Sequence, residues 1–165
     1  AADVPFGIGS GSGVIFGVTG GVTEAVLRRL QQGHNRVDME SIKKSGVRGD
    51  DGIKVLTYNY NGREIKAAVV NGLANADKVL QQIKNHEAEY DFVEVMACRR
   101  GCIMGGGQPV NAGPRTRKAR MKGLYDTDVN TQIKKSNENP MILSLYDTLL
   151  KGKEHELLHR NFSGK

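Results

Sequence analysis

The chain of 165 residues contains no Trp, only four Pro and only two Cys. Two cysteines exclude a disulfide-rich scaffold, and a chain of this length can bury a core that holds the fold without such cross-links. Apolar runs stay well short of the roughly 20 residues of a membrane-spanning helix, and the first residues show no basic region followed by an apolar one. We therefore expect a soluble, cytoplasmic protein with no membrane span.

Negative charge is in the minority, with 18 Asp and Glu against 24 Lys and Arg and a formal net charge of +6. Five of the cations fall within residues 115–122. A run of this kind can bind nucleic acid, but aromatic residues are not interleaved with it and helix-turn-helix or zinc-finger spacing is lacking. We expect no nucleic-acid partner and interpret the run as a basic helix that faces solvent or an acidic partner.

Glycine is abundant, with 21 residues concentrated in 7–21 and 101–107. Backbone without side chains can approach another group closely in both stretches. Within the first stretch, we interpret the apolar run 14–16 as the end of a buried strand. A helix is expected to follow, capped by Thr19 and with an apolar stripe over 22–30.

From residue 53 the sequence pattern changes from one typical of helices to one typical of β-strands. Residues 53–60 and 65–70 are rich in β-formers, and the Asn-Gly pair between them is typical of a hairpin. An amphipathic helix within 73–89 and a short apolar strand at 91–96 follow. Strand, helix and strand in this order imply a right-handed crossover with parallel pairing. The predicted fold class is α/β, a parallel or mixed sheet flanked by helices.

The last third of the chain reads as helical. Residues 111–121 follow a turn marked by Pro, and the Asn139-Pro140 pair begins a second helix because Pro is favoured at the first helical position. A short amphipathic turn closes the chain. These features predict a helical C-terminal segment.

The two cysteines, Cys98 and Cys102, come directly after the strand at 91–96, at the edge where open α/β sheets place their sites. Apolar burial suits them poorly beside Arg99 and Arg100, and a disulfide would close a tiny loop that stabilises little. Zinc requires four ligands, and the four histidines have no finger-like spacing to the cysteines. Cationic neighbours favour a nucleophilic thiolate, but the sequence offers no obvious base.

A soft-metal site is the remaining interpretation. Thiolates hold iron and sulfide, and the charges of Arg99 and Arg100 would offset the negative charge of a cluster. Gly105, Gly106 and Gly107 would let the backbone crowd a bulky cofactor. A four-iron cubane normally takes four cysteines, so another chain or a further segment would have to supply the other two.

The stretch 93–109, VEVMACRRGCIMGGGQP, resembles the third cluster-binding signature of the FeFe hydrogenases, E-x-M-A-C-x-x-G-C-x-x-G-G-G-x-P. Three more stretches are similar to the family in the same order: GSGSGVIFGVTGGVTEAVLR, AAVVNGLANADKVLQQI, and ENPMILSLYDTLL with HELLHRNF. The resemblance covers essentially the whole chain but only the C-terminal part of the family's catalytic domain. It implies one lobe of that domain over 1–136 and a helical segment similar to the small-subunit region over 137–165.

The resemblance also implies roles for individual residues. Cys98 would ligate a 4Fe–4S cubane, and Cys102 would ligate the cubane and bridge to a di-iron unit that carries CO, CN and dithiolate ligands. Met96 and Phe16 match positions that wall the di-iron pocket, so with Cys102 they are the catalytic candidates. The other implied cofactor-binding residues lie in the two glycine-rich stretches: Gly17, Thr19, Gly20, Gly105, Gly106 and Gly107.

Two earlier signatures of the family, around T-S-C-C-P and M-P-C-x-x-K, have no counterpart here. The resemblance thus implies half of a hydrogenase, as a split subunit or a fragment, which would interconvert H2 with protons and electrons only with a partner chain that carries the other two cluster cysteines. Electrons would pass to Fe–S subunits or ferredoxin, and an export signal on the partner would move both chains to the periplasm. The alternative is a non-catalytic relative, a hydrogen sensor or an Fe–S assembly factor.

Overall fold

The structure, a computed structural model, describes residues 7–31, 37–49, 52–110 and 113–160. Within these residues three strands form one mixed sheet in the order β1-β2-β3. Their bounds are β1 (Ile53–Tyr60), β2 (Arg63–Asn71) and β3 (Phe92–Met96). β1 pairs antiparallel with β2, whereas β3 runs parallel to β2 with Met96 opposite Asn71. The C-terminal ends of β2 and β3 therefore lie side by side.

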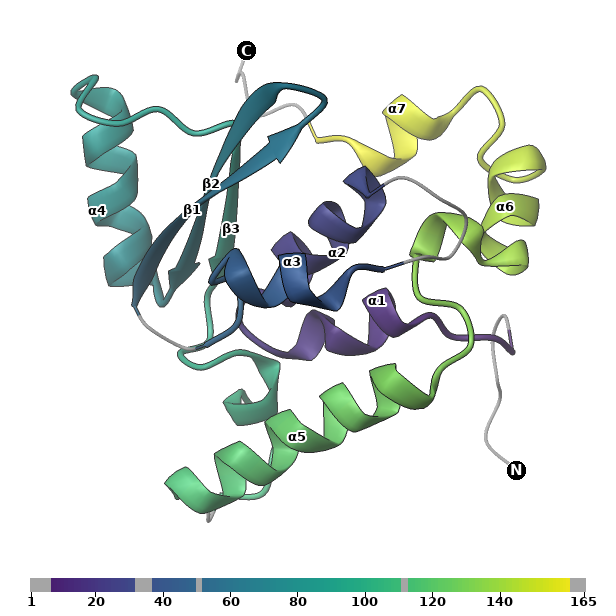
Figure 1. Ribbon diagram of the computed structural model, residues 1–165, viewed down its shortest axis with the longest axis horizontal. Coiled ribbons are helices and arrows are strands. Elements are labelled where there is room, and N and C mark those ends of the chain that lie inside the picture. Colours follow the sequence, from purple (N-terminus) through teal and green to yellow (C-terminus); the bar gives the residue numbers. More distant parts are fainter. Residues whose placement is uncertain (1–6, 32–36, 50–51, 111–112, 161–165) are drawn as a thin grey trace.

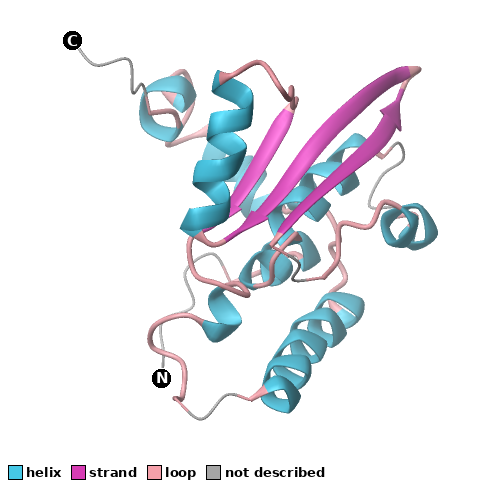
Figure 2. Ribbon diagram, turned by 90° about the vertical axis from the view of Figure 1, so that its left-hand side faces the viewer, coloured by secondary structure: helices cyan, strands magenta, loops and turns pink. Residues whose placement is uncertain are grey.

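Helices cover both faces of this sheet (Figure 1 and Figure 2). α4 (Leu73–Lys84) packs on one face, and α2 (Gly21–Leu30) and α3 (Met39–Lys44) pack on the other. Four successive residues of β2 are buried because alternate side chains enter different cores: Ala68 and Val70 face α4, whereas Ala67 and Val69 face α2 and α3. The expected α/β class, with a mixed sheet flanked by helices, is confirmed.

Local signals fix the hairpin and the crossover. Asn61 and Gly62 have φ of 51° and 80°, the positive values that a tight two-residue turn between β1 and β2 requires. α4 then carries the chain from the end of β2 to the start of β3 and buries Ala76 and Val79 beneath it. The predicted hairpin, helix and parallel strand are all present.

The N-terminal glycine-rich stretch differs from the expectation. It forms a short helix, α1 (Gly11–Val14), followed by a 3₁₀ turn over Ile15–Gly17, so the interpretation of residues 14–16 as a strand end is wrong. The Ser10 side chain caps α1 by accepting the backbone N–H of Gly13 at 3.2 Å. A run of three apolar residues is too short to distinguish a strand from a buried helical turn.

The remaining helices lie along the lower and right-hand edges of the molecule in Figure 1. They are α5 (Pro114–Asn130), α6 (Pro140–Asp147) and α7 (Glu154–Leu158). α6 begins as predicted, because the Asn139 side chain accepts the N–H of Met141 at 2.9 Å. None of these helices, nor any other in the described part of the chain, is long and apolar enough to cross a membrane.

A buried ion network joins α2 to α5. The Arg28 guanidinium donates to both carboxylate oxygens of Asp128, at 2.7 and 2.6 Å, and to Glu24 at 2.6 Å. Arg48 donates to the same Glu24 carboxylate at 2.8 and 2.7 Å. Burial alone lowers the pKa of Arg28, but the hydrogen bonds and charges of Asp128 and Glu24 outweigh it and raise this pKa above its ordinary value. Arg28 therefore stays charged in the interior.

Candidate metal centre

The cysteine loop, residues 97–109, leaves the C-terminal end of β3. A turn closes at its start, where the Gly101 N–H donates to the carbonyl of Cys98 at 3.1 Å, and a 3₁₀ turn follows over Cys102–Met104. This fold of the loop keeps the two cysteines within one compact unit. Both thiols are free and exposed. The loop therefore presents two exposed thiols that are four positions apart.

The loop packs directly on the N-terminal glycine segment, residues 15–21. Gly101 has φ of +81°, and a Cβ there would lie 2.8 Å from the carbonyl oxygen of Gly17 and 3.0 Å from the nitrogen of Thr19. A side chain at position 101 would break this contact. The structure thus brings Cys98 and Cys102 to the same place as Gly17 and Thr19.

Glu94 of β3 holds the glycine segment in position. Its carboxylate is buried and accepts three hydrogen bonds: from the Gly20 N–H at 2.8 Å, the Thr23 N–H at 2.7 Å and the Thr23 hydroxyl at 2.6 Å. The helix cap expected at Thr19 is wrong, because the cap residue of α2 is Gly20, with φ of 87°, and the side chain that satisfies the first turn comes from β3.

Asn71, the last residue of β2, holds the middle of the cysteine loop. Its side-chain oxygen accepts the N–H of Arg100 at 2.7 Å. Arg100 has φ of +70°, a strained value for a residue with a side chain, and such strain persists only where neighbouring contacts impose it. Asn71 and Glu94 stand inside the stretches similar to the hydrogenases, but their roles were not predicted, because their partners lie 29 to 74 positions away.

α5 forms the floor of the site. Ile15, Val18 and Ile103 make a small buried cluster against Leu124 of this helix, and a Cβ on Gly17 would lie 2.9 Å from Leu124 Cδ1. A cavity of about 520 Å³ opens beside this cluster. Its lining includes one of the two cysteines: Val14, Gly17, Cys102, Ile103, Gln108, Arg120, Gly123, Leu124 and Thr127.

The other expected site residues are placed as follows. Phe16 is 45% exposed and Met96 is half-buried at the end of β3. Gly105 touches the cysteines, because a Cβ there would lie 3.2 Å from Cys98 Sγ. Gly106 and Gly107 have open space around them. Gly20 does not face the loop: a Cβ on it would meet the carbonyl oxygen of Val47 at 2.2 Å.

The residues present fit an Fe–S cofactor in part. Thr19 is 2% exposed, and its buried hydroxyl has no hydrogen-bond partner among the described residues. Two thiols suit iron and sulfide, but within the described ranges no group of three or more His, Cys, Asp or Glu side chains could hold a metal ion. The two thiols would therefore suffice for half of a cubane's ligands.

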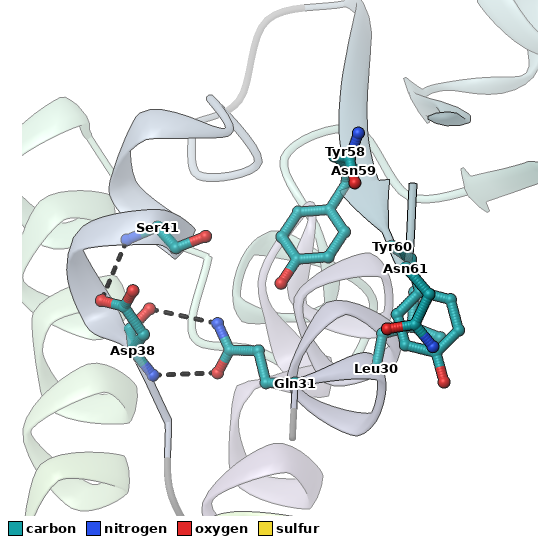
Figure 3. Close-up of a pocket in the computed structure, with 8 residues that line it drawn as sticks. All are labelled: Leu30, Gln31, Asp38, Ser41, Tyr58, Asn59, Tyr60 and Asn61. Carbon is teal, nitrogen blue, oxygen red and sulfur yellow. Dashed lines mark hydrogen bonds between the residues drawn. The ribbon is translucent and has the colours of Figure 1, made fainter. Parts of the chain in front are cut away.

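A second hollow of about 270 Å³ lies at the opposite end of the sheet, next to the β1–β2 turn (Figure 3). Its polar groups bond to one another: the Gln31 side chain pairs with the backbone of Asp38 at 2.9 and 3.2 Å, and the Asp38 carboxylate accepts the N–H of Ser41. Neither cysteine lines it. This hollow is remote from the candidate metal centre.

Comparison with known proteins matches residues 1–106 to the family described as "Iron only hydrogenase large subunit, C-terminal domain" and residues 114–165 to "Iron hydrogenase small subunit". The chain belongs to the iron-only, or FeFe, hydrogenase family. The resemblance found in the sequence is confirmed. We call residues 1–106 the large-subunit-like part and residues 114–165 the small-subunit-like part.

Individual relatives agree with this membership of the FeFe hydrogenases. Iron hydrogenase 1 of Clostridium pasteurianum is 38% identical over 168 residues, which cover 96% of this chain and 29% of that protein. The periplasmic iron hydrogenase large subunit of Nitratidesulfovibrio vulgaris is 43% identical over 111 residues, 67% of this chain and 26% of that protein. A probable cytosolic Fe–S cluster assembly factor of Aedes aegypti is more distant, at 27% identity over 154 residues, 87% of this chain and 31% of that protein.

A solved FeFe-hydrogenase structure from Chlamydomonas reinhardtii has the same fold, with a TM-score of 0.60 and 35% identity over 94% of this chain and 47% of that one. The chain therefore spans less than a third of the curated hydrogenases and about half of the solved structure.

Proposed function

We propose that this chain is one half of an FeFe hydrogenase and supplies two of the four cysteine ligands of its 4Fe–4S cubane. Cys98 would hold the cubane, and Cys102 would hold both the cubane and the di-iron unit. The observation that carries this proposal is the cysteine loop, which presents both thiols against side-chain-free backbone in a chain of this family. When bound, the cofactor supplies the redox chemistry that interconverts H2 with two protons and two electrons.

The chain's own residues prepare the surroundings of that cofactor. Met96 and Phe16 provide apolar surface that keeps water from the di-iron side, and Phe16 becomes covered only when the rest of the domain is present. Thr19 stands in the glycine segment on which the cysteine loop packs, and its backbone would help to shape the surroundings of the cofactor. Gly105 lets the backbone close on Cys98. Gly17, Gly106 and Gly107 complete the proposed cofactor-binding set, whereas Gly20 would contribute indirectly, through the turn before α2.

We propose further that a partner polypeptide provides the other two cysteines and that electrons leave through its Fe–S subunits or ferredoxin. The surface supports a missing partner, because apolar side chains of α6, α7 and the segment between them are 44 to 70% exposed. They are Leu143, Tyr146, Leu149, Leu157 and Leu158. The assembly-factor alternative is less well supported, because identity to the assembly factor is 27% against 38% to the Clostridium hydrogenase. The sensor alternative is distinguished by H2 turnover.

Infrared and EPR spectra of the chain coexpressed with a polypeptide that carries the T-S-C-C-P and M-P-C-x-x-K signatures test the proposal. We expect CO and CN bands together with a cubane signal. Cys102→Ala should abolish the CO and CN bands, whereas Cys98→Ala should chiefly damage the cubane signal. Val110→Ala, at a residue that is 96% exposed just after the loop, is the matched control and should change neither.

A cubane signal without CO and CN bands in the unmodified complex would overturn the catalytic proposal in favour of the assembly-factor alternative. Full H2 turnover in either cysteine variant would overturn the ligand assignment. CO and CN bands without measurable H2 turnover would favour the sensor.

A further inference from the structure

Arg120, in the middle of α5, reaches from its helix to the cysteine loop. Its Nη1 donates to the carbonyl oxygen of Ile103 at 2.7 Å, and its Nη2 donates to that of Pro109 at 3.3 Å. These carbonyls lie on either side of the three glycines, so a single guanidinium spans the part of the loop that follows Cys102. A lysine cannot reproduce this, because it presents one nitrogen where Arg presents a planar fork.

Three other cations of the run 115–122 differ from Arg120. Arg115 and Lys118 are exposed, and Lys122 pairs with Asp126 on its own helix. These three side chains therefore lie on the solvent-facing side of α5, as the sequence suggested. Arg120 is half-buried, and its guanidinium bonds to the cysteine loop.

The same guanidinium lines the cavity of about 520 Å³ that Cys102 also lines. Much of the rest of that lining is apolar or glycine, including Val14, Gly17 and Leu124. A positive charge acts over such a partly desolvated space more strongly than it would through bulk water. Arginine keeps this charge at every physiological pH.

We propose that Arg120 is a positioning residue of the metal centre: it fixes the path of the cysteine loop after Cys102 and keeps a positive charge beside the cluster. The electrostatic part rests on the proposed function, whereas the conformational part concerns this chain alone. The inference gives α5, from the small-subunit-like part, a direct share in a site whose thiols belong to the large-subunit-like part.

Hydrogen exchange on the chain without any cofactor tests the conformational part. The amides of Met104, Gly105 and Gln108 make the internal hydrogen bonds of the loop. In Arg120→Gln we expect roughly tenfold faster exchange at these amides, since two hydrogen bonds to a charged donor are lost, and a smaller acceleration in Arg120→Lys. Arg115→Gln removes the same charge from the same helix and should leave the loop unchanged.

Exchange in β2 serves as the internal reference for folding. If Arg120→Gln unfolds the whole chain, β2 loses protection too, and Arg120→Lys, which keeps the stem and the charge, then decides the question. Loop exchange equal to wild type in the variant that stays folded would overturn the proposal, as would an equal acceleration in Arg115→Gln.

The reduction potential of the cubane in the reconstituted complex tests the electrostatic part. Adding an electron to a cluster is easier beside a positive charge, so we expect Arg120→Gln to lower the potential measured by EPR-monitored titration. Arg120→Lys should stay closer to wild type because it keeps the charge. An unchanged potential in Arg120→Gln would overturn this part. If the wild-type complex held no cubane, the proposed function would fail. The hydrogen-exchange result would still test whether Arg120 fixes the conformation of the cysteine loop.

Discussion

The carboxylate of Glu94 accepts the backbone N–H of Gly20 at 2.8 Å, although the two residues are 74 positions apart. Glu94 stands on β3, four residues before the first cysteine, and Gly20 begins α2. This contact fixes the strand that carries the cysteine loop to the glycine segment on which the loop packs. The geometry of the candidate metal centre therefore depends on a side chain that touches neither thiol in the loop.

Replacing Glu94 should destabilise the chain. In Glu94→Gln one of the three donors now faces an amide N–H2 group, and the charge that strengthened the others is lost, so we expect a loss of about 2–3 kcal/mol in the free energy of unfolding. Urea unfolding measures it. Glu89→Gln, at an exposed position before the same strand, is the control and should fall within about 0.5 kcal/mol of wild type. Equal stability of the two variants would contradict the assigned role of Glu94.

The glycines of the cysteine loop should divide into two classes. Gly101→Ala forces a side chain into positive φ and against Gly17, and we expect a loss of about 2–4 kcal/mol in unfolding free energy. Gly106→Ala meets no atom within 4 Å and should leave the stability of the isolated chain unchanged.

Cofactor loading in the complex provides the second measurement for these glycine variants. Under the proposed function, Gly106→Ala should lower the yield of the cubane signal although the chain remains stable, because its side chain occupies space reserved for the cofactor. Normal loading of Gly106→Ala would remove Gly106 from the proposed cofactor-binding set.

The ion network between α2 and α5 should be sensitive to the loss of its cation. Arg28→Met leaves Glu24 and Asp128 buried without their shared partner, and we expect a loss of about 3–5 kcal/mol in unfolding free energy. Thermal and urea unfolding both report it. Lys122→Met, which breaks an exposed pair with Asp126 on α5, should cost less than about 1 kcal/mol. Similar losses of unfolding free energy in the two variants would contradict the idea that the buried ion network stabilises the fold more than an exposed pair.

Asp91 should give the stability a pH dependence at the acid end. The backbone N–H of Lys66 and the guanidinium of Arg63 hold the pKa of Asp91 below its usual value, even though the side chain is exposed. A lowered folded pKa means that the contribution is complete above the unfolded pKa of about 3.9 and is lost as the pH falls through the folded value.

The stability of Asp91→Asn, compared with that of wild type, tests this contribution. The variant should unfold at lower urea than wild type at pH 7, by a modest margin, and the difference should shrink as the pH drops below about 3.9. A difference that stays constant with pH would show that the charge of Asp91 is irrelevant.

Local signals predicted much of the fold. The Asn61-Gly62 turn, the apolar stripe of α4 and the Asn139-Pro140 start of α6 each depend on residues a few positions apart, and the structure contains all three. The 3₁₀ turn at Ile15–Gly17 was mistaken for a strand because its helical nature depends on packing against Ile103 and α5, which the local sequence does not display.

The candidate site could be predicted only as far as its ligand types. Cys98 and Cys102 could be predicted as site residues from the chemistry of their thiols and from their position directly after a strand. The groups that hold the site, Asn71, Glu94 and Arg120, show no local sign of their partners, since each bonds to a backbone group 11 to 74 residues away. Only the structure shows the backbone group to which each of these three side chains hydrogen-bonds.

The Arg28–Asp128 pair also bears on how the protein is made. Its members are 100 residues apart, so α5 can meet α2 only after the whole segment between them has been synthesised. Until then the contacts of α5 beneath the cysteine loop are absent. Under the proposed function, we therefore expect cofactor insertion to follow translation of α5.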